Sequence, residues 1–240
     1  MTKKVKDSMY LVYDGPSLLD GSPIIVLATG FKRPSANRKT GPIIQTYILR
    51  KDMAPNEALK TGADESICGT CELRGKTCYV LVHQAPTAVW HAYNRRDMKV
   101  AENLNELCKD QVVRFGSYGD PAAVPLTVWQ QLSEGARNNT GYTHAWKYCD
   151  QELQNYCMAS VDNLQDKLAA NAKGWKTFRI KKTGEETVVK ETICAAEKNA
   201  DMTCKMCKLC DGTKKDIAIT VHGTNWKINE FNKLDSGLLI

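Results

Sequence analysis

Cysteine is the residue type with the clearest chemical meaning in this chain, because seven of its ten cysteines fall into two groups. The spacing of the N-terminal cysteine group is C-x2-C-x6-C, and it consists of Cys68, Cys71 and Cys78. The spacing of the C-terminal cysteine group is C-x9-C-x2-C-x2-C, and it consists of Cys194, Cys204, Cys207 and Cys210. Thiolates two residues apart can turn towards one ion or cluster, so such groups indicate metal or redox chemistry.

The C-terminal cysteine group is the stronger metal signal. Its loop is rich in lysine and aspartate, so apolar packing cannot hold it together, and we predict that a bound metal does so. The C-x2-C-x2-C run is typical of a [4Fe–4S] cluster, which we favour, whereas four cysteine ligands also suit Zn²⁺. His222 is an alternative to Cys194 as fourth ligand, since three cysteines and one histidine are a natural zinc set.

The N-terminal cysteine group offers only three ligands. Three protein ligands leave one coordination position open, which is typical of a reactive centre rather than a structural one. We therefore predict that these cysteines bind a [4Fe–4S] cofactor whose remaining position faces substrate or a second cofactor. The alternative is a zinc knuckle completed by a distant ligand such as His83.

Strands alternate with helices along the chain. This alternation implies parallel strands with right-handed crossovers, so we predict an α/β fold, namely a complete or partial (β/α) barrel, with an open doubly wound sheet as the alternative. The predicted strands are 24–27, 43–49, 79–82, 112–116, 142–145, 157–161, 175–180 and 217–221, and the predicted helices are 55–60, 87–107, 121–134 and 164–172. We expect one domain over 1–240, with N-terminal strands and turns in 1–60 and a cysteine-rich metal loop, 190–215, inserted before the last strand.

Polar residues follow several predicted strands. In a barrel the catalytic groups lie where strands end at the C-terminal face. Asp120, His144 and Asp162 occupy such positions, and we predict that they are catalytic and share one pocket with the N-terminal cysteine group. His222 also follows a strand and would line the same pocket. The alternative for both aspartates is a role as helix caps, for which aspartate is favoured.

Composition excludes some classes of protein. No apolar run approaches the roughly 18 residues of a membrane span, and the basic N-terminus leads into no apolar signal core, so we expect a cytoplasmic protein without a membrane partner. Cysteines in that compartment stay reduced, which argues against disulfides. The formal net charge of +6 is compatible with a nucleotide or nucleic-acid partner.

Several short motifs together resemble a family of cysteine-rich proteins encoded by tailed phages. They are Lys39-Thr40-Gly41-Pro42, the N-terminal cysteine group with Cys78-Tyr79, Gly119-Asp120-Pro121, Gly141-Tyr142-Thr143-His144, Met158-Ala159-Ser160-Val161-Asp162 and the C-terminal cysteine group. That family is similar to the radical S-adenosylmethionine iron–sulfur enzymes. The resemblance implies a (β/α) barrel, an iron–sulfur cluster at the three cysteines, S-adenosylmethionine as a cofactor and the cytoplasm of a phage host. The usual cysteine spacing of those enzymes is C-x3-C-x2-C, from which this chain departs.

Three functions follow from these features. The leading prediction is a phage-type iron–sulfur enzyme of nucleotide or nucleic-acid metabolism or modification, including DNA modification. The second is a zinc-stapled nucleic-acid-binding, replication-associated or host-interaction protein without catalysis. Its basic pairs and its aromatic residues, such as Trp129, Trp146, Trp175 and Trp226, would then mark the binding face. The third is a barrel similar to guanine transglycosylases, with zinc held by the last three cysteines and His222. The substrate, the reaction and the oligomeric state stay open.

Overall fold

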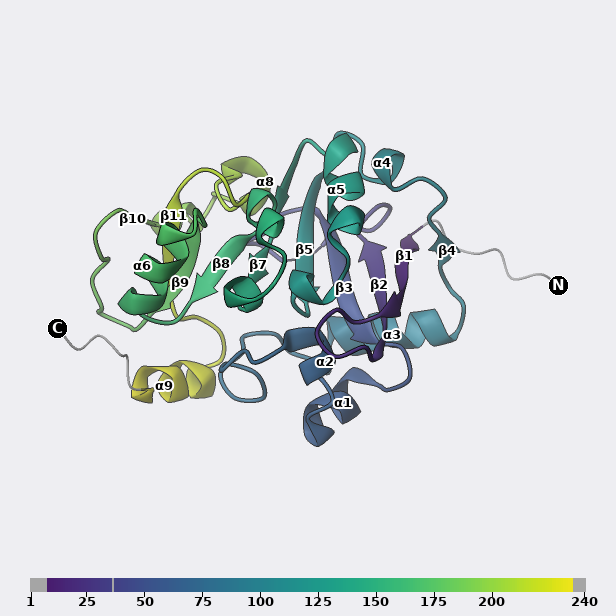
Figure 1. Cartoon of the computed structure of the whole chain (residues 1–240), viewed down its shortest axis with the longest axis horizontal. Coiled ribbons are helices and arrows are strands. Elements are labelled where there is room, and N and C mark those ends of the chain that lie inside the picture. Colours follow the sequence, from purple (N-terminus) through teal and green to yellow (C-terminus); the bar gives the residue numbers. More distant parts are fainter. Residues whose placement is uncertain (1–7, 36, 235–240) are drawn as a thin grey trace.

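The computed structural model describes residues 8–35 and 37–234, which form a mixed α/β fold with two sheets (Figure 1). The first sheet has the strand order β4-β1-β2-β3-β5-β6, and the second has the order β10-β11-β9-β8-β7. The strands are β1 Met9–Pro16, β2 Pro23–Thr29, β3 Ile44–Arg50, β4 Lys99–Val100, β5 Val112–Tyr118, β6 Asn138–Thr140, β7 Tyr142–Thr143, β8 Met158–Val161, β9 Thr177–Lys181, β10 Glu191–Ile193 and β11 Asp216–Thr220.

The helices connect these strands and cover the sheets. Figure 1 shows α1, α2 and α3 on one side of the strands and α8 on the opposite side. The helices are α1 Pro55–Thr61, α2 Glu65–Cys68, α3 Ala85–Asn94, α4 Leu104–Leu107, α5 Leu126–Gly135, α6 Leu164–Ala172, α7 Ala195–Lys198, α8 Cys204–Cys207 and α9 Asn225–Lys233, with 3-10 turns η1 Pro121–Ala123, η2 Ala145–Lys147 and η3 Gln151–Asn155. Among the described residues, no helix is long and apolar enough to cross a bilayer.

Most strand pairs are parallel, as the alternating sequence pattern predicts. Strands β3, β5 and β6 pair in parallel, and so do all the neighbours of the second sheet, whereas β1, β2 and β3 form an antiparallel meander. The two sheets meet at Gly141, where a Cβ atom would lie 2.5 Å from the Cys157 Sγ. The α/β class with parallel strands is thus confirmed. A closed barrel is not shown, because within the described chain the end strands β4 and β10 each pair on one side only.

The core lies on the first sheet. Strand β2 is buried without interruption from Ile24 to Ala28, since it is central in the sheet and covered on both faces. Helix α5 packs its apolar face on β5, where the rings of Trp129 and Phe115 lie 4.6 Å apart. These elements form a rigid wall behind the residues that follow β5.

Three predicted elements were wrong or too long. Residues 79–82 form no strand, because the carbonyls of Cys78 and Val80 accept hydrogen bonds from the Lys227 side chain of α9. The predicted helix 87–107 ends as α3 near Arg96, whose φ of 55° is left-handed, and is followed by β4 and α4. The predicted helix 121–134 is interrupted before Pro125, because the residue before a proline avoids the helical region.

Candidate functional site: a pocket between two cysteine groups

A pocket of about 450 Å³ lies along the inner faces of the parallel strands. Side chains of a strand alternate between its two faces, and the lining residues Phe178 and Ile180 of β9 follow that alternation, whereas on β5 the consecutive residues Gly116, Ser117 and Tyr118 all line the pocket. The lining residues include Arg114, Gly116 and Tyr118 on β5, Thr140 on β6, Tyr142 on β7, Ser160 on β8, Phe178 and Ile180 on β9, and Ile219 on β11. The volume is that of a pocket for a small-molecule ligand.

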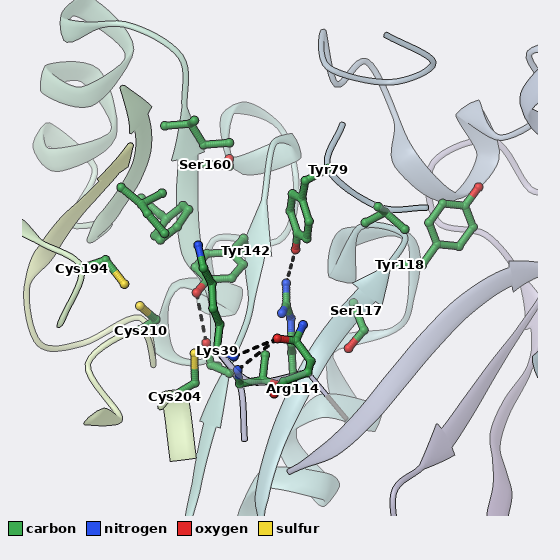
Figure 2. Close-up of a pocket in the computed structure, with 18 of the residues that line it drawn as sticks. Lys39, Tyr79, Arg114, Ser117, Tyr118, Tyr142, Ser160, Cys194, Cys204 and Cys210 are labelled. Atoms are coloured by element: carbon green, nitrogen blue, oxygen red, sulfur yellow. Dashed lines mark hydrogen bonds between the residues drawn. The ribbon is translucent and has the colours of Figure 1, made fainter. Parts of the chain in front are cut away.

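All seven grouped cysteines line this pocket, whereas the three isolated cysteines, Cys108, Cys149 and Cys157, do not. The N-terminal cysteine group reaches it from α2 and the turns that follow, and the C-terminal cysteine group reaches it from β10 and α8. Figure 2 shows Cys194, Cys204 and Cys210 together on one wall of the pocket. The fold therefore brings two sequence-distant thiol clusters to a common space.

The N-terminal cysteine group is held by a series of turns. Cys68 ends α2, the amide of Cys71 donates to the Cys68 carbonyl, and the amide of Cys78 donates to the Leu73 carbonyl at 2.9 Å. Burial and the neighbouring thiols raise the pKa of Cys68 well above its usual value. Burial also raises the pKa of Cys78, opposed by a hydrogen bond from the Val80 amide to its sulfur.

His144 connects this group to Asp162. It follows β7, and its Nε2 lies 3.8 Å from the Cys71 Sγ and 3.5 Å from an Asp162 carboxylate oxygen. Burial opposes the charged imidazole, but hydrogen bonds to Asp162 and Cys71 outweigh burial and raise the pKa of His144 well above its usual value. His144 lines the pocket, whereas Asp162 lies behind it and contacts the imidazole.

Asp120 is both a helix cap and a pocket residue. One carboxylate oxygen accepts from the Ala122 amide at 2.9 Å, as expected of the residue that begins η1. The other accepts from the His144 amide at 2.8 Å, so Asp120 fixes the backbone that carries the imidazole. Burial raises the pKa of Asp120, opposed by the Thr143 hydroxyl and both amides. The two alternatives drawn from the sequence, cap and pocket residue, therefore apply together.

The C-terminal cysteine group has backbone anchors but no core of its own. Cys194 donates its amide to the Ala218 carbonyl at 2.8 Å, and Cys204 donates its amide to the Lys39 carbonyl at 2.9 Å. No residue from 194 to 210 is fully buried, although several are half-buried, and α7 and α8 have only four residues each. Helices this short are not stable by themselves. The loop therefore lacks an apolar source of stability, as the sequence indicates.

The four thiols of that group lie close enough to influence one another. Burial raises the pKa of Cys210 to about 12; the other three cysteines raise it further, whereas a hydrogen bond from the Tyr142 hydroxyl opposes the rise. Burial also raises the pKa of Cys194, whose sulfur accepts hydrogen bonds from the Ala196 and Glu197 amides. Amides directed at sulfur are a common feature of cysteines that ligate metal clusters.

His222 lies on the pocket wall beside other partners. Its ring lies 5.7 Å from the Tyr79 ring, and its Nδ1 is 3.2 Å from the Thr220 carbonyl. Burial and the nearby Lys39 lower the pKa of its imidazole. Cys194, rather than His222, thus shares electrostatic contact with the other three cysteines, although the choice of fourth ligand stays a prediction.

Sequence reasoning missed the residues between the two groups. Arg114 lies over the rings of Tyr79 and Tyr142, at 5.9 and 5.8 Å from their centroids, and donates a hydrogen bond to the Tyr79 hydroxyl (Figure 2). A signal was present in the sequence, because Arg114 interrupts the apolar strand Val112 to Phe115 at an inward position. A charged residue there indicates a pocket rather than a filled core.

The donors present are suitable for metal, but no preformed site is seen. Among residues 8–35 and 37–234, no three histidine, cysteine, aspartate or glutamate side chains stand together at the spacing of metal ligands. Both groups nevertheless supply soft thiolate donors, and each contains a sulfur that accepts backbone amide hydrogen bonds. Metal binding by either group stays a prediction. Comparison with family models, curated proteins and solved structures found no match for the chain.

Proposed function

We propose that this protein is a metalloenzyme in which two cysteine-ligated centres face one substrate pocket. The observation that supports this proposal most strongly is that every grouped cysteine lines the same cavity, while every isolated cysteine lies outside it. Structural metal sites have no need of a shared cavity, whereas a reactive centre requires one. We further propose that the two sheets curve around this cavity as a partial (β/α) barrel.

The residues have distinct roles in this proposal. Cys68, Cys71 and Cys78 would hold a [4Fe–4S] cluster, which supplies one-electron chemistry and an open coordination position. The C-terminal cysteine group would hold a second cluster or Zn²⁺. The substrate would be a nucleotide or nucleic acid, and S-adenosylmethionine would fit only as a second ligand of the same pocket.

His144 is placed to bind or move a proton beside the N-terminal cysteine group. Its Nε2 is the atom that faces both Cys71 and Asp162. Asp162 stabilises the protonated imidazole, and Asp120 holds the His144 backbone amide in position. Asp120 and His144 thus form a polar wall of the pocket, supported by Asp162 behind the imidazole, and this wall orients whatever the pocket binds.

One distance favours a second candidate, a zinc-stapled protein without catalysis. Zn–S bonds of about 2.3 Å and Zn–N bonds of about 2.0 Å place two ligands of a tetrahedral zinc about 3.5 Å apart. The separation of the Cys71 Sγ and His144 Nε2, 3.8 Å, is close to that value. His144 would then complete a closed three-cysteine-plus-histidine site, and the pocket would bind nucleic acid without a reactive metal.

Metal and sulfide analysis of protein purified without oxygen tests the proposal. We expect iron and acid-labile sulfide in wild type and in Cys149→Ala, a matched control at an isolated cysteine outside the pocket. Cys71→Ala should lose the metal of the N-terminal cysteine group and retain that of the C-terminal cysteine group. Zinc without sulfide would support the second candidate. Complete metal loss from Cys71→Ala would contradict two separate centres.

A further inference from the structure

Arg114 is a pocket cation without a counter-ion. Its guanidinium donates to the Tyr79 hydroxyl, and its buried Nε has no hydrogen-bond partner among the described residues. In the described part of the chain, no carboxylate forms an ion pair with this half-buried side chain, whereas the buried cations Arg179 and Lys167 are paired with Glu185 and Glu191 and with Asp216. Burying a charge without a partner is costly. A persistent unpaired cation inside a cavity therefore points to an anionic ligand.

The charge of the lining supports the same conclusion. Among the described lining residues, Arg38, Lys39 and Lys208 are further cations, and Asp120 is the single carboxylate. The Asp120 carboxylate accepts hydrogen bonds from the Ala122 and His144 amides and forms no ion pair with Arg114. An anion of more than one negative charge would match this excess of cations better than a single carboxylate.

The cations also lie on elements that meet at the pocket. Arg114 projects inward from β5. Lys39 lies on the loop between β2 and β3, and its own backbone carbonyl accepts a hydrogen bond from the Cys204 amide. Lys39 is exposed, so it can move towards a ligand at the mouth of the pocket, while Arg114 is fixed between two tyrosine rings. The arrangement combines a rigid inner contact with an adaptable outer one.

We propose that Arg114, with Lys39 and Arg38, binds a phosphate group of the ligand in the space between the two cysteine groups. Arginine offers a planar fork of donors that matches phosphate oxygens, and lysine adds charge at the entrance. This proposal relies on the proposed function only for the pocket being the substrate site. It narrows the ligand to compounds that carry phosphate and places that phosphate within the cavity.

Calorimetric titration of the full-length, metal-containing protein tests the subsite. The probes are inorganic phosphate and AMP, with adenosine and succinate as matched compounds that lack phosphate. We expect phosphate and AMP to bind at millimolar concentration or tighter, and adenosine and succinate to bind at least tenfold more weakly. Stronger binding of succinate than of phosphate would assign the cations to a carboxylate and overturn the proposal.

Variants locate the binding. Arg114→Gln should weaken AMP binding by about tenfold or more, since a hydrogen bond to a charged group contributes about 1.5 to 3 kcal/mol. Lys39→Gln, at an exposed position that tolerates substitution, should weaken it by up to about fivefold. Arg33→Gln is the control, because Arg33 lies on the same loop, is exposed and does not line the pocket. Equal AMP affinity in wild type and Lys39→Gln, together with an unchanged affinity in Arg114→Gln, would overturn the proposal.

Metal content separates this inference from the proposed function. If Arg114 serves the ligand, Arg114→Gln should keep the wild-type iron, zinc and sulfide content while losing AMP affinity. If Arg114 instead neutralises metal-bound thiolates, the variant should lose metal, and the phosphate subsite is wrong while the two-centre proposal stands. Should Arg114→Gln fail to fold, the AMP affinities of Lys39→Gln and Arg33→Gln still test the phosphate subsite, because both positions are exposed.

Discussion

Replacing Cys207 with serine is expected to lower the midpoint of thermal unfolding by about 6 to 12 °C, which corresponds to about 3 kcal/mol for a chain of this size. The reason is that the 194–210 loop contains no fully buried residue, so the free energy of the proposed metal binding would be its main source of stability. The loop should also become sensitive to trypsin at Lys205 and Lys208. Differential scanning calorimetry and limited proteolysis measure both effects.

The neighbouring Met206 provides a matched control for that variant. Its side chain is 62% exposed on the same short helix, so Met206→Ser should leave the unfolding midpoint and the metal content unchanged. A chelator should lower the midpoint of wild type and of Met206→Ser, with little further effect on Cys207→Ser. An unchanged midpoint together with unchanged metal content in Cys207→Ser would exclude metal from this loop.

Replacing Asp216 with asparagine is expected to lower the free energy of unfolding by about 3 to 5 kcal/mol near neutral pH, because it leaves the Lys167 ammonium buried without a counter-ion. The Lys167 Nζ lies 3.0 Å from the Asp216 carboxylate, and both side chains are at least nine-tenths buried. The same carboxylate accepts from Asn171 and from the Thr177 amide, and so joins α6 to β9 and β11. Urea denaturation measures the difference.

Two further variants and a pH series show whether the buried charge is the cause. Asp14→Asn, which removes an exposed partner of Lys51, should cost far less stability than Asp216→Asn. Adding Lys167→Met to Asp216→Asn should recover stability, since the unpaired charge is removed. Similar losses for Asp14→Asn and Asp216→Asn would contradict the buried-pair account.

The stabilisation that the Asp216 carboxylate provides depends on pH in a defined direction. Burial opposes the Asp216 carboxylate, but hydrogen bonds from the Thr177 amide and Lys167 outweigh it and hold its folded-state pKa below the usual value. The unfolded chain therefore binds this proton first as the pH falls. The stabilisation is complete above a pH of about 4 and disappears as the pH drops through the lower folded-state pKa. The difference in the free energy of unfolding between wild type and Asp216→Asn should accordingly become smaller in acid.

The sequence predicts the buried strands and amphipathic helices of the fold well and the outer strands of its sheets poorly. Apolar runs at 24–27 and 43–49 became β2 and β3, and the prediction of a helix over 164–172 matches α6, because burial and capping dominate there. Strand β1, Met9–Pro16, was missed because its apolar and polar residues alternate only weakly. One of its two neighbours in the sheet, β4, also comes from a distant part of the chain. Such long-range pairing leaves little trace in local sequence.

The candidate site was predictable where one residue type carries the signal. Cysteine spacing identified both groups, and the positions of Asp120 and His144 after β5 and β7 predicted their shared pocket with the N-terminal cysteine group. That the C-terminal cysteine group also lines this pocket was not predictable, since it depends on how the chain from β10 returns over the strands. Arg114 was missed because a lone arginine in a strand is usually solvated.

Anomalous X-ray diffraction from anaerobically grown crystals tests the central claim most directly, because data at the iron and zinc absorption edges locate and identify each metal. We expect two separate peaks on the wall of one pocket. The first should bond to the sulfurs of Cys68, Cys71 and Cys78, and the second to those of the C-terminal cysteine group. A single peak shared by both groups, or metal bound away from the pocket with the thiols unligated, would contradict the account.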